Sequence, residues 1–371
     1  MKMYWKLLFV CISMMSGMIV QAQNLKKIFG DAEKKSNSMI MELAFITAEK
    51  PELISPRTYE NGKLKAVASR DWTSGFFPGV LWFLYEFTGK GPWKETATTL
   101  TSKLEQEKFN AGTHDMGFKI YCSFGNGYRH TKDPKYREVI IQAAKTLSTR
   151  FNKTIGCIRS WDHNRDKWDF PVIIDNMMNL ELLFAATRLT GDSSFYKIAV
   201  SHANTTMKNH FRPDYSSYHV IDYDSLTGQV RKRNTHQGFS HESAWSRGQA
   251  WALYGYTMCY RETKDPAYLQ QAENIAKFIL THPNMPNDLV PYYDFDAPGI
   301  PNEPRDASAA AIIASALYEL STYSNKGKNY RISADKICVN LTDNYRSRIN
   351  EKVPFILLHS TGSKPSNSEV D

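Results

Sequence analysis

Apolar stretches of two kinds alternate along the chain. The first kind, such as NMMNLELLFAATRL from Asn176 and GQAWALYGYTMCYRE from Gly248, is apolar on nearly every side. A helix of that composition is buried on most sides. The second kind, such as YLQQAENIAKFIL from Tyr268, has one apolar stripe and a charged face, as expected of a helix that covers a core. The alternation therefore predicts inner helices, each followed by an outer helix.

A short polar turn joins each inner helix to the outer helix after it, and this unit recurs five times. In two copies the turn has the identical sequence TKDP, at 131–134 and 263–266. Asp133 and Asp265 suit the N-cap position, and the proline after each suits the first helical position, where no N–H is needed. Recurrence of one helical hairpin predicts an architecture built by repeating it.

An outer helix near Leu25 to Glu49 and five inner–outer pairs account for the pattern, with inner helices starting near Gly75, Asp115, Asp175, Ala244 and Asp306. Helical hairpins that curve until they close form a toroid. We therefore predict an all-α (α/α)6 toroid in a single domain over residues 23–371. A sixth inner helix is due just after Asp371, so we expect this sequence to lack the last one. The only β structure predicted is a short hairpin near 218–233, where HVIDYD and GQVRKR flank a turn.

In such a toroid the same end of every inner helix faces one rim, and acidic residues stand near these ends: Asp71, Asp115, Asp175, Glu242, Asp306, and Glu369 with Asp371. Aspartate is a favoured N-cap, so we interpret Asp71 and Asp306 as caps. Asp115 and Asp175 have neighbours, among them His114 and Trp161, that do not suit a plain solvated cap. We predict that these two are working carboxylates, with simple capping as the alternative.

The first 22 residues have the pattern of a secretory signal peptide. Lys2 and Lys6 precede an apolar run from Leu7 to Val20, and Ala22 ends a small-residue cleavage site. The run is too short to span a membrane. We expect cleavage after Ala22 and a periplasmic protein.

The formal net charge is +8, which favours polyanionic partners, but no nucleic-acid-binding motif accompanies it. The basic cluster Arg231–Arg233 indicates a solvated loop or, as a second interpretation, contact with an acidic glycan. Four cysteines follow the signal, Cys122, Cys157, Cys259 and Cys338, without a paired metal-ligand spacing. We expect no metal and no cofactor, with Cys122 and Cys259 as buried free thiols.

Six segments near the predicted rim resemble one known family. They are DWTSGFFPG from Asp71, HDMGF from His114, IIDNMMNLELL from Ile173, THQGF from Thr235, SAWSRGQAWALYG from Ser243 and LLHSTGSKPSNSEVD from Leu357. Together they resemble the unsaturated glucuronyl hydrolases of glycoside hydrolase family 88, over about Leu25 to Asp371. The resemblance implies an (α/α)6 toroid, in agreement with the helix count.

The resemblance also implies a reaction. Enzymes of this family act on acidic oligosaccharides left by polysaccharide lyases, and they hydrate the C4=C5 double bond of the terminal uronic acid. Asp175 matches the family's general acid and base, and Asp115 matches its second essential carboxylate. A helix N-terminus lowers the pKa of a carboxyl group, whereas a proton donor needs a raised pKa. We expect burial and the charge of Asp115 to outweigh the helix dipole at Asp175.

The resemblance further implies a set of substrate contacts. Arg247 and Trp251 lie four residues apart on one helix face, which suits a carboxylate and a sugar ring. The full set is Trp72, His114, Trp161, His219, Thr235, Gln237, Arg247, Trp251, His359, Ser360 and Ser363.

Three alternatives stay open. An unsaturated rhamnogalacturonyl hydrolase shares the fold and the hydration chemistry but belongs to a different family. A non-catalytic periplasmic glycan-binding protein could use the same toroid. An isomerase or epimerase would need paired catalytic histidines at the rim, for which His114 and His241 are candidates.

Overall fold

The computed structural model describes residues 2–369, with side chains from Leu25 to Glu369. The predicted signal peptide and Asp371 therefore lie outside the residues whose side chains are described. Between Leu25 and Glu369, no helix is both long and apolar enough to cross a membrane.

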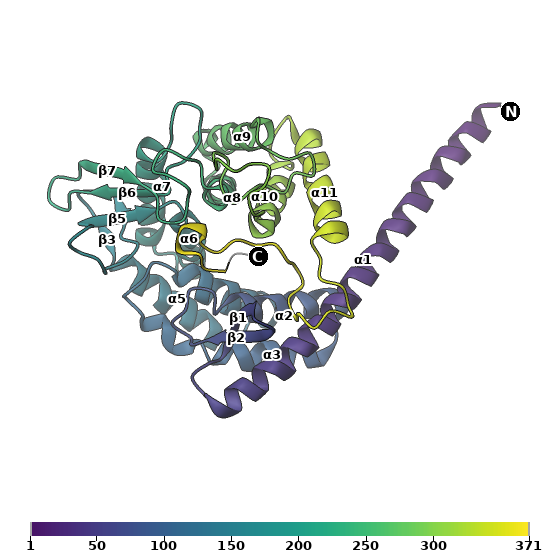
Figure 1. Ribbon diagram of the computed structural model, residues 1–371, viewed down its shortest axis with the longest axis horizontal. Helices are drawn as coiled ribbons and strands as arrows, with labels where there is room; N and C mark the ends of the chain where they lie inside the picture. Colours follow the sequence, from purple (N-terminus) through teal and green to yellow (C-terminus); the bar gives the residue numbers. More distant parts are fainter. Residues whose placement is uncertain (1, 370–371) are drawn as a thin grey trace.

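Helices dominate the structure and alternate between two layers (Figure 1). The inner layer consists of α2 (Phe76–Thr88), η2 (Gly117–Gly125) continuing into α4 (Asn126–Thr131), α6 (Asn176–Thr190), α8 (Ser246–Thr263) and α10 (Ala307–Leu320). The outer layer consists of α1 (Lys2–Glu49), α3 (Gly91–Ser102), α5 (Pro134–Ser148), α7 (Ser193–Asn209), α9 (Pro266–Thr281) and α11 (Gly327–Asn344). The five predicted starts of inner helices are each correct to within two residues.

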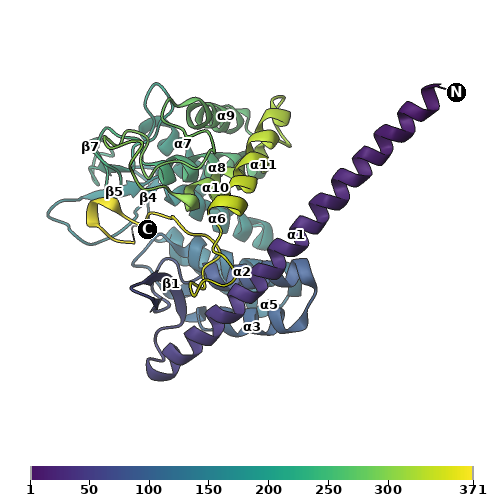
Figure 2. The same cartoon turned by 45° about the vertical axis from the view of Figure 1, so that its right-hand side comes forward.

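Successive inner helices pack against one another, which arranges them in an arc. α2 contacts η2, η2 contacts α6, α6 contacts α8, and α8 contacts α10. Each inner helix also packs against the outer helix that follows it, as α8 does with α9. The same layering is visible after a 45° rotation (Figure 2). These contacts bury a continuous apolar core that runs from Leu81 on α2 to Tyr345 after α11.

The two TKDP turns adopt the same structure, as their identical sequences predict. Lys132 and Lys264 end their helices in the left-handed conformation, with φ of 57° and 60°. Asp133 accepts a 2.9 Å hydrogen bond from the Lys135 N–H, and Asp265 accepts one of 2.9 Å from the Ala267 N–H. Both aspartates are therefore the N-caps that the sequence predicts.

The inner helix after Asp115 differs from a regular α-helix because its first nine residues form the π-helix η2. The start of η2 packs directly on α6, with room at position 117 only for glycine. A Cβ atom added to Gly117 would lie 2.7 Å from the Cα of Asn179, which is too close. The Phe118 N–H donates to Asn179 Oδ1 at 3.1 Å. Such wide turns commonly occur near functional sites.

The prediction of a single β-hairpin is wrong, because the structure contains three small sheets. The predicted hairpin is present as β6 (Val220–Tyr223) and β7 (Val230–Asn234), and β5 (Phe170–Ile173) pairs antiparallel with β6. Two further hairpins are β1 (Ser55–Glu60) with β2 (Lys63–Val67), and β3 (Phe151–Asn152) with β4 (Cys157–Ile158). Asn61 and Gly62 carry positive φ between β1 and β2, and the Asn-Gly pair is the sequence signal that could have found this hairpin.

The four cysteines of the described chain are free thiols. Cys259 is buried, as predicted, whereas Cys122 is only half-buried. Cys122 lies where the π-helix passes close to α2. The two backbones are so close that a Cβ atom added to Gly79 of α2 would lie 2.8 Å from the carbonyl oxygen of Cys122.

Candidate active site

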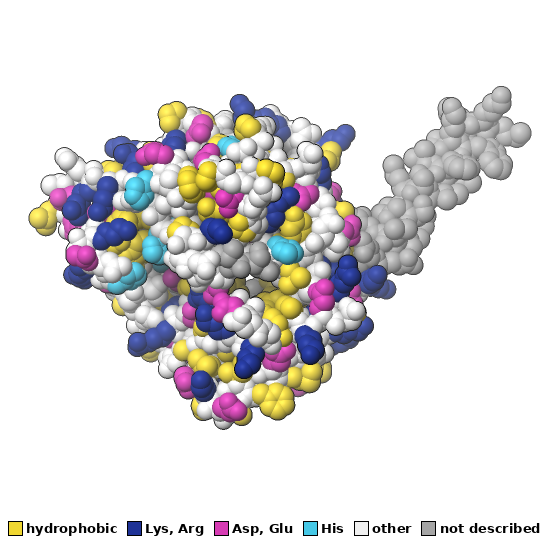
Figure 3. Space-filling model, viewed as in Figure 1, with side chains coloured by type: hydrophobic (Ala, Val, Ile, Leu, Met, Phe, Trp, Pro, Cys, Tyr) yellow, Lys and Arg dark blue, Asp and Glu magenta, His cyan; other side chains and the backbone are white. Residues whose placement is uncertain are grey.

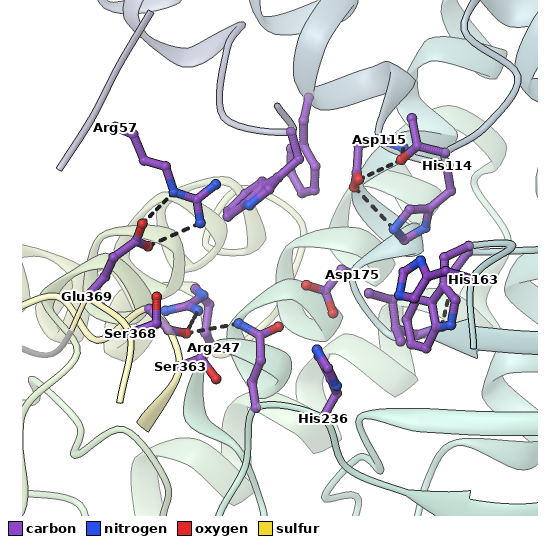
Figure 4. A pocket seen from close by; sticks show the side chains of 18 of the residues that line it. Arg57, His114, Asp115, His163, Asp175, His236, Arg247, Ser363, Ser368 and Glu369 are labelled. Carbon is purple, nitrogen blue, oxygen red and sulfur yellow. Dashed lines mark hydrogen bonds and ion pairs between the residues drawn. The ribbon is translucent and has the colours of Figure 1, made fainter. Parts of the chain in front are cut away.

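A cavity of about 370 Å³ lies at the N-terminal ends of the inner helices (Figure 4). Its walls come from distant parts of the sequence, because Arg57 and Glu369 both line it. Asp115 and Asp175 line the same cavity, so the structure brings the two predicted carboxylates together.

Asp175 occupies the N-cap position of α6 but does not act as a cap. Its backbone is helical, with φ −55° and ψ −28°, and its side chain accepts no capping hydrogen bond. The residue is only 9% exposed, and its Oδ2 atom is buried without a hydrogen-bond partner among the described residues. Strand β5 leads directly into this position, where the Ile174 N–H donates to the His219 carbonyl at 3.0 Å. The simple capping interpretation is therefore wrong for Asp175.

The environment of Asp175 favours its protonated form. The pKa of Asp175 is raised to about 6, mainly by burial and also by the charge of Asp115, while His114 and Arg247 oppose the rise. The expectation that burial would outweigh the helix dipole is thus met.

The environment of Asp115 favours its ionised form. Thr113 Oγ1–H donates to Asp115 Oδ2 at 2.7 Å, and His114 Nε2 lies 3.1 Å from Oδ1. Burial alone would raise the pKa of Asp115, but His114, Thr113 and the charge of Lys119 together lower it. The two carboxyl groups therefore have pKa values that are pushed apart, as in sites that need one acid and one carboxylate.

Of the two aspartates predicted as helix caps, Asp306 caps its helix and Asp71 does not. Asp306 caps α10, accepting from the Ser308 and Ala309 N–H groups at 3.1 and 3.2 Å. Asp71 does not cap α2, whose N-cap is Gly75. The Asp71 carboxylate instead accepts from the Thr73 N–H at 2.9 Å, a local turn contact that competes with helix capping.

Six of the predicted substrate contacts line the cavity: Trp72, His114, Trp161, Gln237, Arg247 and Ser363. Arg247 is buried, and its guanidinium forms a 2.8 Å ion pair with Asp306. It also donates to the carbonyl of Gly362 at 2.7 Å, and Gln237 Nε2 donates to the same carbonyl at 2.9 Å. Residues 361–369, which we term the C-terminal strap, are held against the cavity by these bonds.

The other five predicted contacts, Trp251, His219, Thr235, His359 and Ser360, do not line the cavity. Trp251 lies beneath it, 5% exposed and 5.1 Å from the ring of Phe118. Thr235 Oγ1 accepts from the Gly238 N–H at 2.8 Å and so shapes its own loop. The carbonyl of His359 accepts from the Ala307 N–H at 2.9 Å, which joins the chain before the strap to α10.

His219 stands behind Asp175. Its Nε2 atom lies 3.6 Å from Asp175 Oδ2. Its Nδ1 atom accepts from the N–H groups of His236 and Gln237 at 3.1 and 3.2 Å. Burial, followed by the charges of His236 and Arg247, lowers the pKa of His219 well below its ordinary value. The ring is therefore neutral with its proton on Nε2, facing the carboxylate.

Four ionisable side chains of the cavity were not predicted as site residues: Arg57, His163, His236 and Glu369. Arg57 forms an ion pair with Asp71 at 2.5 Å. It forms a second ion pair with Glu369, which Figure 4 shows. Arg57 belongs to the hairpin β1–β2, which the sequence reasoning missed. His163 stacks on Trp161 with ring centroids 5.6 Å apart, and His236 lies 5.9 Å from the same ring.

Comparison with known proteins gives consistent matches. The profile of Glycosyl Hydrolase Family 88 matches residues 51–259. An unsaturated glucuronyl hydrolase of Formosa agariphila is 56% identical over 82% of this chain and 76% of its own length. An unsaturated chondroitin disaccharide hydrolase of Streptococcus pyogenes serotype M1 is 30% identical over 87% of this chain and 82% of its own. The crystal structure of an unsaturated glucuronyl hydrolase specific for heparin superimposes with a TM-score of 0.86 at 46% identity, covering 92% of each chain.

Proposed function

The chain belongs to Glycosyl Hydrolase Family 88, and we propose that it removes the 4,5-unsaturated uronic acid from the non-reducing end of polysaccharide-lyase products. The substrates are glycosaminoglycan oligosaccharides of chondroitin, hyaluronan or heparin type, and the reaction is hydration of the C4=C5 double bond. The relatives whose names refer to chondroitin disaccharides and to heparin support this substrate class.

The observation that carries the proposal is the pair Asp175 and Asp115 in one cavity. Hydration of an enol ether needs a proton for C4 and a water for C5. Asp175, whose pKa is raised to about 6, supplies the proton. Positive charge then develops at C5, and the ionised Asp115 stabilises it.

The remaining steps return the site to its starting state. The Asp175 carboxylate accepts a proton from the water that attacks C5, so one proton and one hydroxide have been added across the double bond. The resulting C5 hemiketal opens, and the neighbouring sugar is released. Neither a metal nor a redox cofactor is needed to balance this step.

The cavity walls supply substrate contacts in this proposal. Trp72 and Trp161 offer aromatic faces to sugar rings, and Ser363 on the strap offers a hydroxyl group. Arg247 and Gln237 provide donors for the uronate carboxylate. Trp251, Thr235, His359 and Ser360 support these groups from outside the cavity, and His219 supports Asp175.

Family membership favours this function over the alternatives. Rhamnogalacturonyl hydrolases belong to a different family. A glycan-binding protein would not need two carboxyl groups with opposed pKa shifts. An isomerase with His114 and His241 as paired catalytic histidines is disfavoured because His114 lines the cavity and His241 does not.

We place the mature protein in the periplasm, with a signal peptide cleaved after Ala22 and one catalytic domain from residue 23 onward. The apolar run from Leu7 to Val20 and the two lysines before it support export. Mass spectrometry of the protein recovered from cells would give the first residue of the mature chain.

The test of the function is loss of the ultraviolet absorbance of the conjugated double bond. Unsaturated disaccharides from chondroitin, hyaluronan and heparin are compared with unsaturated pectin fragments. We expect turnover of glycosaminoglycan products that disappears in Asp175→Asn. Turnover of the pectin fragments alone would support the rhamnogalacturonyl alternative, and binding without turnover would support the glycan-binding alternative.

A further inference from the structure

Two lysine side chains gather over one tryptophan beside the cavity. Lys167 Nζ lies 4.8 Å and Lys232 Nζ 5.1 Å from the ring centroid of Trp168. The two lysines come from separate segments, the loop before β5 and strand β7. Lys232 Nζ also donates to the Lys167 carbonyl at 2.6 Å, which fixes its position. Figure 3 shows basic and histidine side chains gathered on this side of the molecule, over β5 to β7.

Two acidic side chains of the neighbouring segments, Asp162 and Asp222, are already paired with arginines. Asp222 lies 3.3 Å from Arg231. Asp162 pairs with Arg150 at 2.6 Å and with Arg159 at 3.3 Å. Asp166 is exposed on the same loop as Lys167. The two ammonium groups add positive charge to this surface, and an external anion would be attracted to them.

This cationic surface is continuous with the cavity. The ring of Trp168 meets that of Trp161 edge-on, with centroids 5.8 Å apart and an interplanar angle of 81°. Trp161 lines the cavity, as do His163 and His236 on either side of it. The two lysines are therefore separated from the cavity wall at Trp161 by the ring of Trp168 alone.

We propose that Trp161, Trp168, Lys167 and Lys232, which we term the cationic wall, form a binding site for a sulfate ester on the oligosaccharide held in the cavity. The half-buried Trp161 offers its face to a sugar ring, while Trp168, which is only 3% exposed, carries the two lysines. Compact ammonium groups attract a freely rotating sulfate without demanding one geometry. This inference rests on the proposed function, since it assumes that the cavity holds an acidic glycan.

The experiment compares the wild-type protein with the double variant Lys167→Gln/Lys232→Gln on matched pairs of sulfated and unsulfated unsaturated disaccharides at constant ionic strength. The wild type prefers the sulfated member, and the ratio of its kcat/KM values falls about tenfold in the double variant, because two solvent-facing ion contacts are lost. Substrates with sulfate at different positions show which sulfate the wall binds.

A matched control is Lys132→Gln/Lys264→Gln. These lysines also lie over aromatic rings, at 5.3 Å from Tyr128 and 5.4 Å from Tyr260, but at the opposite ends of the inner helices. The control leaves the ratio at the wild-type value. A wild type without sulfate preference, or a double variant with an unchanged ratio, overturns the proposal.

Binding measurements separate this proposal from the proposed function. Calorimetry with saturated heparin tetrasaccharides, sulfated and chemically desulfated, needs no turnover. Weaker binding of the sulfated probe alone by the Lys167→Gln/Lys232→Gln variant supports the cationic wall even if no substrate is hydrolysed. Equal binding of both probes by the wild type overturns it even if the hydrolase activity is present.

Discussion

His219 Nε2 faces Asp175 Oδ2 across 3.6 Å, and both atoms are buried without a hydrogen-bond partner among the described residues. An N–H directed at a carboxylate stabilises its ionised form, so this contact opposes the burial that raises the pKa of Asp175. The backbone N–H groups of His236 and Gln237 hold the imidazole in this orientation. The loop at the cavity mouth is therefore connected to the proposed proton donor.

Replacing His219 with Asn should keep an acceptor for the two backbone N–H groups but remove the N–H that faces Asp175. We expect kcat/KM to fall by about 10-fold, because Asp175 loses the polar group that faces its carboxylate. The pKa of Asp175 should rise, because its carboxylate loses a stabilising contact. The decline in activity should therefore move to higher pH. His202→Asn is the control, since His202 Nδ1 also accepts a backbone N–H, from Ile158 at 3.0 Å. Movement of the pH profile in the control would contradict this explanation.

Replacing Asp175 with Asn should abolish activity and stabilise the fold. General acid–base catalysis contributes about 10²- to 10⁴-fold, so kcat should fall at least by that range. The folded-state pKa of about 6 exceeds the ordinary 3.8, so the unfolded chain ionises first and the free energy of unfolding falls between pH 4 and 6. Above pH 6, ionising the buried carboxyl group costs the folded protein up to about 3 kcal/mol, and the Asn variant does not bear this cost. Urea unfolding at pH 4 and pH 7.5 checks this, with the gain expected only at pH 7.5.

Replacing Asp115 with Asn should lower activity and shift its pH dependence. In the wild type, kcat/KM should fall as the pH rises through about 6, because Asp175 loses its proton. The charge of Asp115 raises the pKa of Asp175, so its removal should move this decline to lower pH. The residual activity of Asp115→Asn, measured from pH 4 to 8, gives the shift. A decline that moves to higher pH would show that the two carboxyl groups do not interact as described.

Replacing Arg57 with Gln should loosen the C-terminal strap. The guanidinium lies between the carboxylates of Asp71 and Glu369, and all three side chains are about one-fifth exposed. Without Arg57 the two acids face each other, and we expect a loss of about 1–3 kcal/mol in unfolding free energy. KM should rise more than kcat falls, since the strap carries Ser363. Arg57→Lys should restore part of the KM effect, and equal losses in both variants would argue against a role for the charge.

The buried ion pair of Lys119 and Glu107 should be needed for the loop that leads to Asp115. Their side chains are 0% and 3% exposed, with Nζ and Oε2 2.8 Å apart. Lys119→Met leaves a buried carboxylate without its cation and should cost about 3–5 kcal/mol. The double variant Lys119→Met/Glu107→Gln removes both charges and should recover most of that loss. Thermal unfolding of the three proteins compares the two effects, and a double variant no better than the single one would contradict this account.

The helices were predictable because their signals are local. Inner and outer helices differ in apolar periodicity, and Asp133 and Asp265 cap helices through contacts within two residues. The resemblance to a known family then indicated which two carboxylates of the rim, Asp115 and Asp175, are catalytic candidates. Neither signal shows the direction of a side chain, which is why Asp71 was expected to cap a helix and does not.

The missed parts depend on contacts between distant residues. Arg57 and Glu369 are separated by 312 residues, and no periodicity relates them. Strand β5 is a four-residue apolar run, too short to be distinguished from buried helix by pattern alone. The π-helix η2 follows from close packing of Gly117 on Asn179, which the sequence of neither segment reveals.

The closure of the cavity by the C-terminal strap has a consequence for synthesis of the protein. Arg57, Asp115 and Asp175 leave the ribosome long before Gly362 and Glu369, and domains fold from the N-terminal side as the chain emerges. The carboxylate pair can therefore form while one wall of the cavity is still untranslated. Catalytic competence should therefore wait until the strap docks, and a protein truncated after residue 360 should keep its helical body but show little activity.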